Sequence, residues 1–315
     1  GHLRRYCEYG SRLCIRLLRD GRALLVTDHR IQGSDENRVA IERIGEAAPR
    51  KRTLGERPMS GIRVLDLTRV IAGPVCGRTL AAHGADVLAI SGPTLPFMGT
   101  LIMDVGRGKR TAHIELTDPA GRETLAGLAR DADVFVQGFR PGAIAGKGFS
   151  PERVAALSPG IIAVSLCAYG YSGPWSGRRG FDSLVQTASG INHAEASAAG
   201  VTGPKELPCQ ALDHATGYFM AFGAMMALIR QMREGGSWHV RVSLAATGHW
   251  LSGLGRQLAA IKGTDVPREA IGDLLEESAS GFGPMSAVRH AGLLSRTPPH
   301  WTRPSMPLGS HEARW

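Results

Sequence analysis

From Gly61 onward the chain alternates short apolar runs with segments of helical periodicity, and this alternation restricts its fold more than any other feature of the sequence. Short apolar runs bounded by glycine, proline and aspartate are typical of buried strands. The predicted strands are residues 62–67, 85–90, 110–116, 134–136 and 161–166, and the predicted helices are 74–84, one from 119 onward, and 151–157. The pattern predicts an α/β fold with an open, mainly parallel, Rossmann-like sheet and helices on both faces.

A second group of elements follows this alternation. A long helix rich in alanine and methionine is predicted from Asp213 to Met232, and Gly235 and Gly236 end it. The following residues, 238–244, alternate well enough to form another strand. The helix begins with an aspartate, a residue type that commonly caps helix N-termini. An N-cap role is therefore one interpretation of Asp213.

Composition excludes several classes of protein. With 43% hydrophobic and 21% charged residues, the chain has the balance of a folded domain rather than a disordered one. No apolar run approaches the roughly 18–20 residues that a membrane helix needs. The five cysteines are scattered without a CxxC pair, which favours a reducing, cytoplasmic setting. Cytoplasmic localisation without membrane association is therefore expected.

The formal net charge of +9 invites a test for nucleic-acid binding. Nucleic-acid proteins concentrate basic groups on one face, with aromatic side chains that stack on bases. Here the densest basic cluster is Arg50–Arg52, which follows Pro49 in a stretch predicted to be a solvated linker. The charge therefore argues against nucleic acid but is compatible with a small ligand that carries phosphates.

General catalytic motifs leave the activity open. The sequence contains no GxGxxG dinucleotide loop, no GxSxG nucleophile elbow and no HExxH zinc motif. Asp213 and His214 are sequence neighbours, which point in different directions on a helix and make a poor metal pair. No metal site is predicted.

An ordered set of segments resembles the class III CoA-transferases, the family that includes formyl-CoA transferase, carnitine–CoA transferase and α-methylacyl-CoA racemase. The first is residues 61–74, which read GIRVLDLTRVIAGP. The later matches, in order, are 84–87, 108–110, 132–134, 138–142, 169–170, 172–174, 180–182, Gln186, 189–190, Asp213, Gly217 and 240–244. The resemblance covers about residues 61–254.

The resemblance also implies a division of the chain. Family members insert a small domain after the segment equivalent to 244–254, and then return to the large domain with a TP…P-LG-H pattern that residues 295–298 and 307–311 resemble. The short intervening segment implies a strongly reduced small domain. The predicted division is an N-terminal extension and linker (1–60), a large domain (61–254), a reduced small-domain remnant (255–283) and a C-terminal return segment (284–315). The return segment is expected to add the final strand material to the sheet, from about residues 284–309.

In the transferases of this family an aspartate is the nucleophile that attacks an acyl-CoA thioester, and the resemblance places it at Asp213. The function implied is transfer of CoA from an acyl-CoA to a small carboxylic acid, with CoA as substrate and no permanently bound cofactor. Backbone N–H groups and the helix dipole are expected to keep this carboxylate ionised at neutral pH. The aspartate would serve as both helix cap and nucleophile.

The resemblance implies that CoA is held by basic side chains and by the first loops. The candidate residues are Arg69, Val70, Lys109, Arg110, Phe139, Arg140, Lys147 and Arg179. For each basic residue the alternative is an exposed surface charge. After the second strand the sequence departs from the family, because Ser91 and Gly92 replace its usual acidic residue and arginine.

Two alternatives to a transferase stay open. The racemase branch carries a histidine one residue before the aspartate of the Gly180-Phe181-Asp182 match, but Phe181 has no proton to exchange. The reduced small domain suggests instead a non-catalytic or partner-dependent CoA-binding protein. Family members form interlocked dimers, so a homodimer or a companion subunit is expected as partner.

Overall fold

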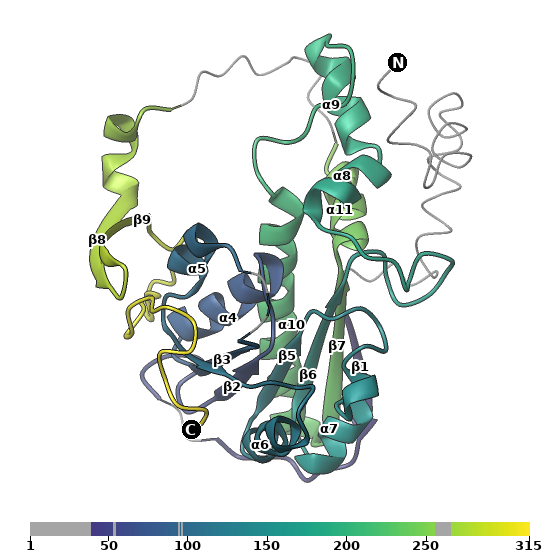
Figure 1. Cartoon of the computed structure of the whole chain (residues 1–315), viewed down its shortest axis with the longest axis vertical. Coiled ribbons are helices and arrows are strands. Elements are labelled where there is room, and N and C mark those ends of the chain that lie inside the picture. Colours follow the sequence, from purple (N-terminus) through teal and green to yellow (C-terminus); the bar gives the residue numbers. More distant parts are fainter. Residues whose placement is uncertain (1–38, 53–54, 94, 96, 256–265) are drawn as a thin grey trace. The chain divides into compact units, whose positions relative to one another are not determined.

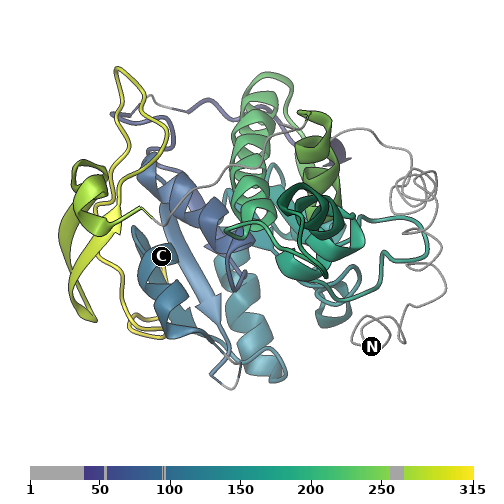
Figure 2. The same cartoon turned by 90° about the horizontal axis from the view of Figure 1, so that it is seen from above.

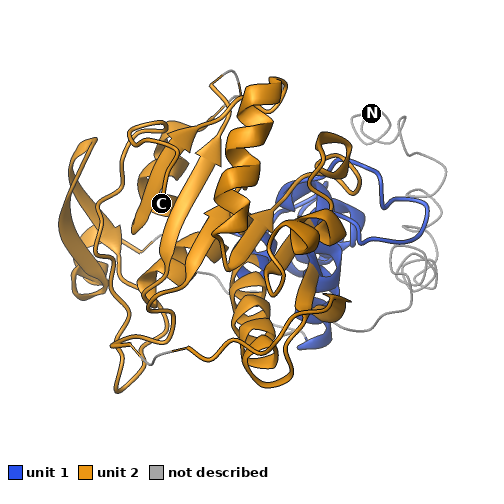
Figure 3. Ribbon diagram, turned by 90° about the horizontal axis from the view of Figure 1, so that it is seen from below, with its two compact units in different colours: residues 1–38, 167–216, 242–262 blue, residues 39–166, 217–241, 263–315 orange. Residues whose placement is uncertain are grey.

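The computed structural model describes residues 39–52, 55–93, 95, 97–255 and 266–315 (Figure 1). Compact unit 2 comprises residues 39–166, 217–241 and 263–315, whereas compact unit 1 comprises 1–38, 167–216 and 242–262, within the described ranges (Figure 3). Residues 1–38 and 256–265, which fall in the predicted extension and small-domain remnant, lie outside the described residues. Within the described ranges, no helix has both the length and the apolar character to span a bilayer.

Unit 2 is built on a seven-stranded sheet in the order β1-β7-β6-β5-β2-β3-β4. Its parallel pairs are β6 with β5, β5 with β2, β2 with β3, and β3 with β4. The parallel strands are β2 (Arg63–Asp66), β3 (Asp86–Ser91), β4 (Lys109–His113), β5 (Val134–Gln137) and β6 (Ile162–Cys167). The predicted open, mainly parallel sheet is therefore confirmed.

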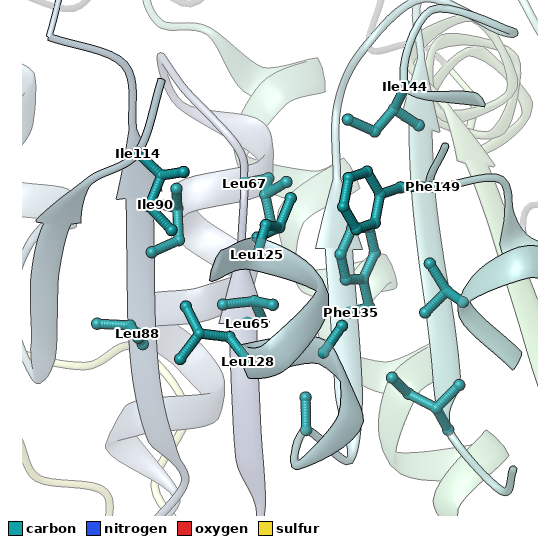
Figure 4. Close-up of a cluster of buried hydrophobic side chains, with 14 of the residues drawn as sticks. Leu65, Leu67, Leu88, Ile90, Ile114, Leu125, Leu128, Phe135, Ile144 and Phe149 are labelled. Atoms are coloured by element: carbon teal, nitrogen blue, oxygen red, sulfur yellow. The ribbon is translucent and has the colours of Figure 1, made fainter. Parts of the chain in front are cut away.

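Helices cover both faces of this sheet, as the sequence predicts. They include α4 (Ala72–Ala82), α5 (Gly99–Val105), α6 (Pro119–Arg130), η1 (Ala145–Lys147), α7 (Pro151–Leu157) and most of α10 (Ala211–Glu234). Leu65 of β2 packs with Leu125 and Leu128 of α6 in a buried hydrophobic cluster that also contains the stacked rings of Phe135 and Phe149 (Figure 4). Because neighbouring strand residues point to opposite faces, Val64 and Asp66 lie on the α4 side.

Close approach of α10 to α4 depends on a glycine. A Cβ atom on Gly217 would lie 2.5 Å from the Ala72 carbonyl oxygen and 2.7 Å from the Val75 Cβ. Both distances are shorter than van der Waals contact, so the two helices can lie side by side only with glycine at this position (Figure 2).

The edge strand β1 (Ala40–Gly45) lies in the segment that the sequence predicts to be an extension and linker. It pairs antiparallel with β7 (Ser237–Ser243), and Glu42 forms an ion pair with Arg241 across the two strands at 3.0 Å. Its residues are intermediate or exposed rather than alternating between buried and exposed. An edge strand of this kind lacks the period-two signal from which strands are predicted.

The basic cluster after β1 has a structural role, and its prediction as solvated is wrong for two of its three residues. The Arg52 guanidinium contacts the Asp133 carboxylate at 2.7 Å, and Arg50 contacts the same carboxylate at 3.3 Å. Arg50 also donates to the Pro159 carbonyl oxygen at 2.6 Å. These contacts fasten the segment after β1 to the turns that precede β5 and β6.

The C-terminal segment returns to the sheet of unit 2, as the resemblance implies. The Gly108 N–H donates to the Arg303 carbonyl oxygen, and the His311 N–H donates to that of Thr111, both at 2.9 Å. Trp315 Nε1 donates to the Leu128 carbonyl oxygen, also at 2.9 Å.

The return segment nevertheless adds no strand to the seven-stranded sheet within the described residues, so the expectation that 284–309 supplies the final strand material is wrong. Prolines are frequent in it, at positions 284, 298, 299, 304 and 307, and proline cannot donate a ladder hydrogen bond. A separate antiparallel hairpin forms instead from β8 (Leu275–Ser280), which precedes the return segment, and β9 (Gly283–Val288), which lies at its start. The hairpin is preceded by η2 (Arg268–Leu274). This hairpin spans the boundary proposed between residues 283 and 284.

Candidate active site

The parallel strands β2 and β5 are neighbours in the sheet, but the chain leaves them in opposite directions. After β2 it continues to β3 and β4, whereas after β5 it continues to β6 on the other side. Ligands of open α/β sheets bind at such a reversal, outside the carboxyl ends of the strands. Four predicted binding residues follow these ends: Arg69 and Val70 after β2, and Phe139 and Arg140 after β5. Residues 67–71 and 138–140 are called the switch-point loops below.

Asp66, the last residue of β2, shapes the first of these loops. Its Oδ1 atom accepts hydrogen bonds from the backbone N–H and the hydroxyl of Thr68. Two residues later Val70 has a φ of 73°, in the left-handed region that β-branched residues rarely adopt. Strain of this kind is frequent where a loop is shaped for a ligand. Arg69 is exposed between them.

Lys109 is buried beneath this loop, with 4% of its side chain exposed. Its ammonium donates to Asp66 Oδ2 and to the Pro74 carbonyl oxygen, each at 2.8 Å. A Cβ atom on Gly77 of α4 would lie 2.3 Å from Asp66 Oδ2, so the glycine makes room for the ion pair. A phosphate bound to Lys109 would have to displace both partners, and its role in binding CoA stays a prediction.

Arg110 and Lys147 lie outside the switch-point loops. Arg110 pairs in register with Leu88 near the amino end of β4, and its guanidinium contacts Asp86 at 2.9 Å. It also donates to the Arg314 carbonyl oxygen at 2.6 Å, so the return segment occupies this cation. Lys147 ends η1, after the second loop, and is half-buried. The structure therefore does not bring Arg110 together with Arg69 and Arg140.

Asp213 belongs to unit 1 and lies in the first turn of α10. The helix begins two residues earlier, at Ala211, so the interpretation of Asp213 as an N-cap is wrong. Instead, the Asp213 N–H is itself capped, because it donates to Asp182 Oδ2 at 2.8 Å. Asp182 is the first residue of α8 (Asp182–Ala188). The two aspartates thus meet through one backbone hydrogen bond.

The environment of Asp213 disfavours its charged form. Its side chain is almost fully buried, with 5% of the residue exposed. Burial and, secondarily, the charge of Asp182 raise the pKa of Asp213 from its ordinary value of 3.8 to about 7. The helix N-terminus does not outweigh these two effects, contrary to the expectation that it keeps the carboxylate fully ionised at neutral pH.

The second carboxyl oxygen of Asp182 is bound by the Gln186 side chain. One helical turn along α8, its Nε2 group donates to Asp182 Oδ1 and, at 3.3 Å, to the Cys209 carbonyl oxygen. Its Oε1 atom accepts from the Leu207 N–H at 3.0 Å. The carboxamide therefore links α8 to the segment that leads into α10. The i,i+4 spacing of Asp182 and Gln186 is visible in the sequence, but their connection to Asp213 is not.

The remaining residues of interest in unit 1 lie just before α8. Arg179 is exposed, which fits both a cation that binds a ligand and an ordinary surface charge. Phe181 is 58% exposed and occupies the N-cap position of α8, where its side chain offers no proton. Across the described residues of both units, no group of three or more His, Cys, Asp or Glu side chains could hold a metal ion.

The sequence of the chain is similar to those of known proteins. The sequence model described as CoA-transferase family III matches residues 59–289. The chain is 36% identical over 200 residues to acetyl-coenzyme A transferase nodX of Hypoxylon pulicicidum, a match that covers 62% of this chain and 34% of that protein. It is 35% identical over 197 residues to the mouse succinyl-CoA:glutarate CoA-transferase, a match that covers 57% of this chain and 43% of that protein.

A solved structure supports the same fold. The orthorhombic crystal form of Rv3272 from Mycobacterium tuberculosis superposes with a TM-score of 0.67 at 21% identity, and the match covers 81% of this chain and 98% of that one. The chain spans less than half the length of the two curated relatives that it matches above.

Proposed function

The chain belongs to CoA-transferase family III, and on this basis we propose that it moves CoA from an acyl-CoA donor to a carboxylic acid acceptor through a covalent intermediate on Asp213. The observation that carries the proposal is the buried Asp213 carboxyl in the first turn of α10, beside Asp182. A buried, sparsely solvated carboxylate with a raised pKa is more basic than one in water and is therefore a better nucleophile.

In each step of the proposed reaction, one bond to a carbonyl carbon forms and another breaks. The Asp213 carboxylate attacks the thioester carbonyl carbon, the C–S bond breaks, and CoA leaves as a thiolate from the resulting mixed anhydride. The thiolate then attacks the aspartyl carbonyl and releases the donor acid, which leaves an aspartyl-CoA thioester. The acceptor carboxylate attacks this thioester and forms a second anhydride, from which the thiolate takes the new acyl group and frees Asp213.

For CoA itself we propose contact with the switch-point loops, which present Arg69 and Arg140 outside the sheet. Val70 and Phe139 lie beside them, and the strained backbone of Val70 supports a ligand-shaped loop. Arg179 and Lys147 are proposed as further cations near the phosphates. Lys109 and Arg110 remain candidates that would first have to give up Asp66 and Asp86.

CoA is expected to bind with about micromolar affinity that weakens as salt is added, because its phosphates meet guanidinium groups. Replacement of both arginines, Arg69→Ala with Arg140→Ala, should weaken binding about tenfold or more and flatten the salt dependence. Isothermal titration at low and high ionic strength measures both. Arg130→Ala, an exposed arginine at the end of α6, is the matched control and should change neither. No detectable binding at either salt concentration would remove CoA as the ligand.

A turnover assay separates the proposed transferase from its alternatives. Succinyl-CoA with glutarate and formyl-CoA with oxalate are suitable pairs, because relatives are named for these reactions. A transferase produces new acyl-CoA only when donor and acceptor are both present. A racemase exchanges an α-proton without any acceptor, and a CoA-binding protein does neither. Product formation that persists without an acceptor, or in Asp213→Ala, contradicts the proposal.

The assembly and location follow as proposals of the same kind. We place the protein in the cytoplasm, where it acts as a homodimer or with a companion subunit that supplies the reduced small-domain part. Determination of the native mass in solution, with and without CoA, tests the proposed assembly.

A further inference from the structure

Three buried side chains of unit 1 form a chain of contacts that ends at the proposed nucleophile. Asp182 is 1% exposed, Gln186 is 2% exposed, and both lie on α8. Asp182 uses one carboxyl oxygen for the Gln186 carboxamide and the other for the Asp213 N–H. We propose that Asp182, oriented by Gln186, is a positioning residue that fixes the backbone of Asp213 and controls when its carboxyl group is ionised. This inference deepens the proposed function and rests on it.

The hydrogen-bond pattern treats the two aspartates differently. Two N–H donors meet the two oxygens of Asp182, which is the arrangement that suits a carboxylate acceptor. For Asp213, burial and the neighbouring carboxylate both act against the charged form, and no hydrogen bond from the described part of the chain offsets them. Burial and the neighbouring Asp182 carboxyl group therefore oppose a negative charge on Asp213. Like charges held this close in a poorly solvated site disfavour the second ionisation.

Among the charged groups of unit 1, Asp182 is the one that raises the pKa of Asp213. Besides Asp182, the titratable groups described around α8, α9 (Ile191–Ala199), α11 (Leu244–Gly253) and the segment before α10 are Arg178, Arg179, His193, Glu195, Lys205, Glu206, Cys209, His214 and His249. Asp182 is the charged group that acts on Asp213, after burial itself. The Arg178 guanidinium lies over the Trp175 ring, 5.0 Å from its centroid.

Gln186 is suited to the positioning role because its carboxamide is fixed at both ends. Nε2 donates to Asp182 and to the Cys209 carbonyl oxygen, while Oε1 accepts from the Leu207 N–H. A glutamine at this position cannot rotate without loss of at least one of these bonds. These bonds favour the orientation of Asp182 in which Oδ1 accepts from Gln186 and Oδ2 faces the first turn of α10.

The test is a titration of Asp213 itself, followed by carbon NMR of protein labelled at the aspartate side-chain carboxyl, with Asp213→Asn to assign the resonance. In Asp182→Asn the titration midpoint is expected to fall by about one pH unit or more, because a like charge is removed while the side-chain shape is kept. The pH at which the covalent adduct reaches half its maximal rate should fall by the same amount. A side chain with a merely structural role would not shift either midpoint.

A second variant keeps the test meaningful if the single substitution unsettles α8. In Asp182→Asn with Gln186→Glu, the side chain at position 182 becomes the donor and the side chain at position 186 becomes the acceptor of the hydrogen bond between them. The introduced asparagine can still accept from the Asp213 N–H through its amide oxygen, and the introduced glutamate can still accept from the Leu207 N–H. Only the 3.3 Å contact to the Cys209 carbonyl oxygen is lost. The negative charge moves one helical turn along α8, away from the residue that contacts Asp213, so the Asp213 midpoint should lie between those of the wild type and the single variant.

Thr247→Val is the matched control. It removes the buried hydroxyl contact between Thr216 and Thr247, 2.7 Å long and in the same unit, without altering any charge. Its Asp213 midpoint should equal that of the wild type. An unchanged midpoint in Asp182→Asn, or an equal fall in Thr247→Val, overturns the inference. Because the NMR titration needs no turnover, a shifted midpoint in a protein that forms no adduct would reject the proposed function while showing that Asp182 still acts on the ionisation of Asp213.

Discussion

Incubation with an accepted acyl-CoA is expected to leave a covalent adduct on the Asp213 side chain, and hydroxylamine should convert it to an aspartyl hydroxamate that peptide mass spectrometry locates. The expectation follows from the proposed anhydride and aspartyl-CoA thioester, both of which carry an activated aspartyl carbonyl group. Because the pKa of Asp213 is raised to about 7, the rate of adduct formation should increase as the pH rises through neutrality.

Asp213→Asn should abolish the adduct, because the amide is nearly isosteric with the carboxyl group but is a poor nucleophile. Its binding of CoA should persist, since the switch-point loops retain their arginines. A hydroxamate on another residue, or wild-type turnover in Asp213→Asn, would show that the nucleophile lies elsewhere in the chain.

Stability provides the control that separates lost chemistry from lost structure. The folded protein holds the Asp213 proton up to about pH 7, whereas the unfolded chain releases it near 3.8. Stability is therefore lost as the pH rises between these values, by at most about 4 kcal/mol at 1.36 kcal/mol per pH unit. Asp213→Asn escapes this loss, so urea denaturation at pH 8 should find it at least as stable as the wild type. A large destabilisation would instead mean that Asp213 is needed for folding.

The parallel part of the fold could be predicted because its signals are local. Buried strands appear as apolar runs, and Asp118 caps α6 through a hydrogen bond from the Ala120 N–H, as the sequence indicates. The edge strand β1 has no such signal, because its partner β7 lies almost two hundred residues later in the chain. Arg50 and Arg52 read as solvated for the same reason, since Asp133, with which they pair, is visible only once the chain has folded.

Some features of the candidate site could likewise be predicted from the sequence, and others could not. The strand order that brings Arg69 and Arg140 to one edge follows from a parallel sheet, and the resemblance points to both residues. The ionisation of Asp213 could not be predicted, because it depends on burial and on Asp182, thirty-one residues away. A helix-dipole argument considers only the helix's own end. The position of a carboxyl group is thus easier to infer from sequence than its proton affinity.

The buried pair of Lys109 and Asp66 is the contact on which the first switch-point loop depends, and its disruption should have the largest effect on stability. Lys109→Met leaves the Asp66 carboxylate buried without its cation, which is expected to cost about 3–5 kcal/mol of unfolding free energy. Chemical denaturation measures this loss. Arg130→Met, which breaks the exposed pair with Glu123 at 3.6 Å, is the matched control and should cost about 1 kcal/mol or less.

A double variant then tests whether Lys109 contributes to CoA binding through its own charge or only by holding the loop that carries Arg69. Lys109→Met with Asp66→Asn removes both charges but keeps an oxygen that can accept from the Thr68 N–H and hydroxyl, so most of the lost stability should return. Binding of CoA should return with it if the ion pair serves only to hold the loop that carries Arg69. If stability recovers while CoA binding stays lost, Lys109 contacts the ligand directly, as the resemblance implies, and exchanges Asp66 for a phosphate when CoA binds. A cost near that of Arg130→Met would mean that the pair is solvated in solution and does not shape the loop.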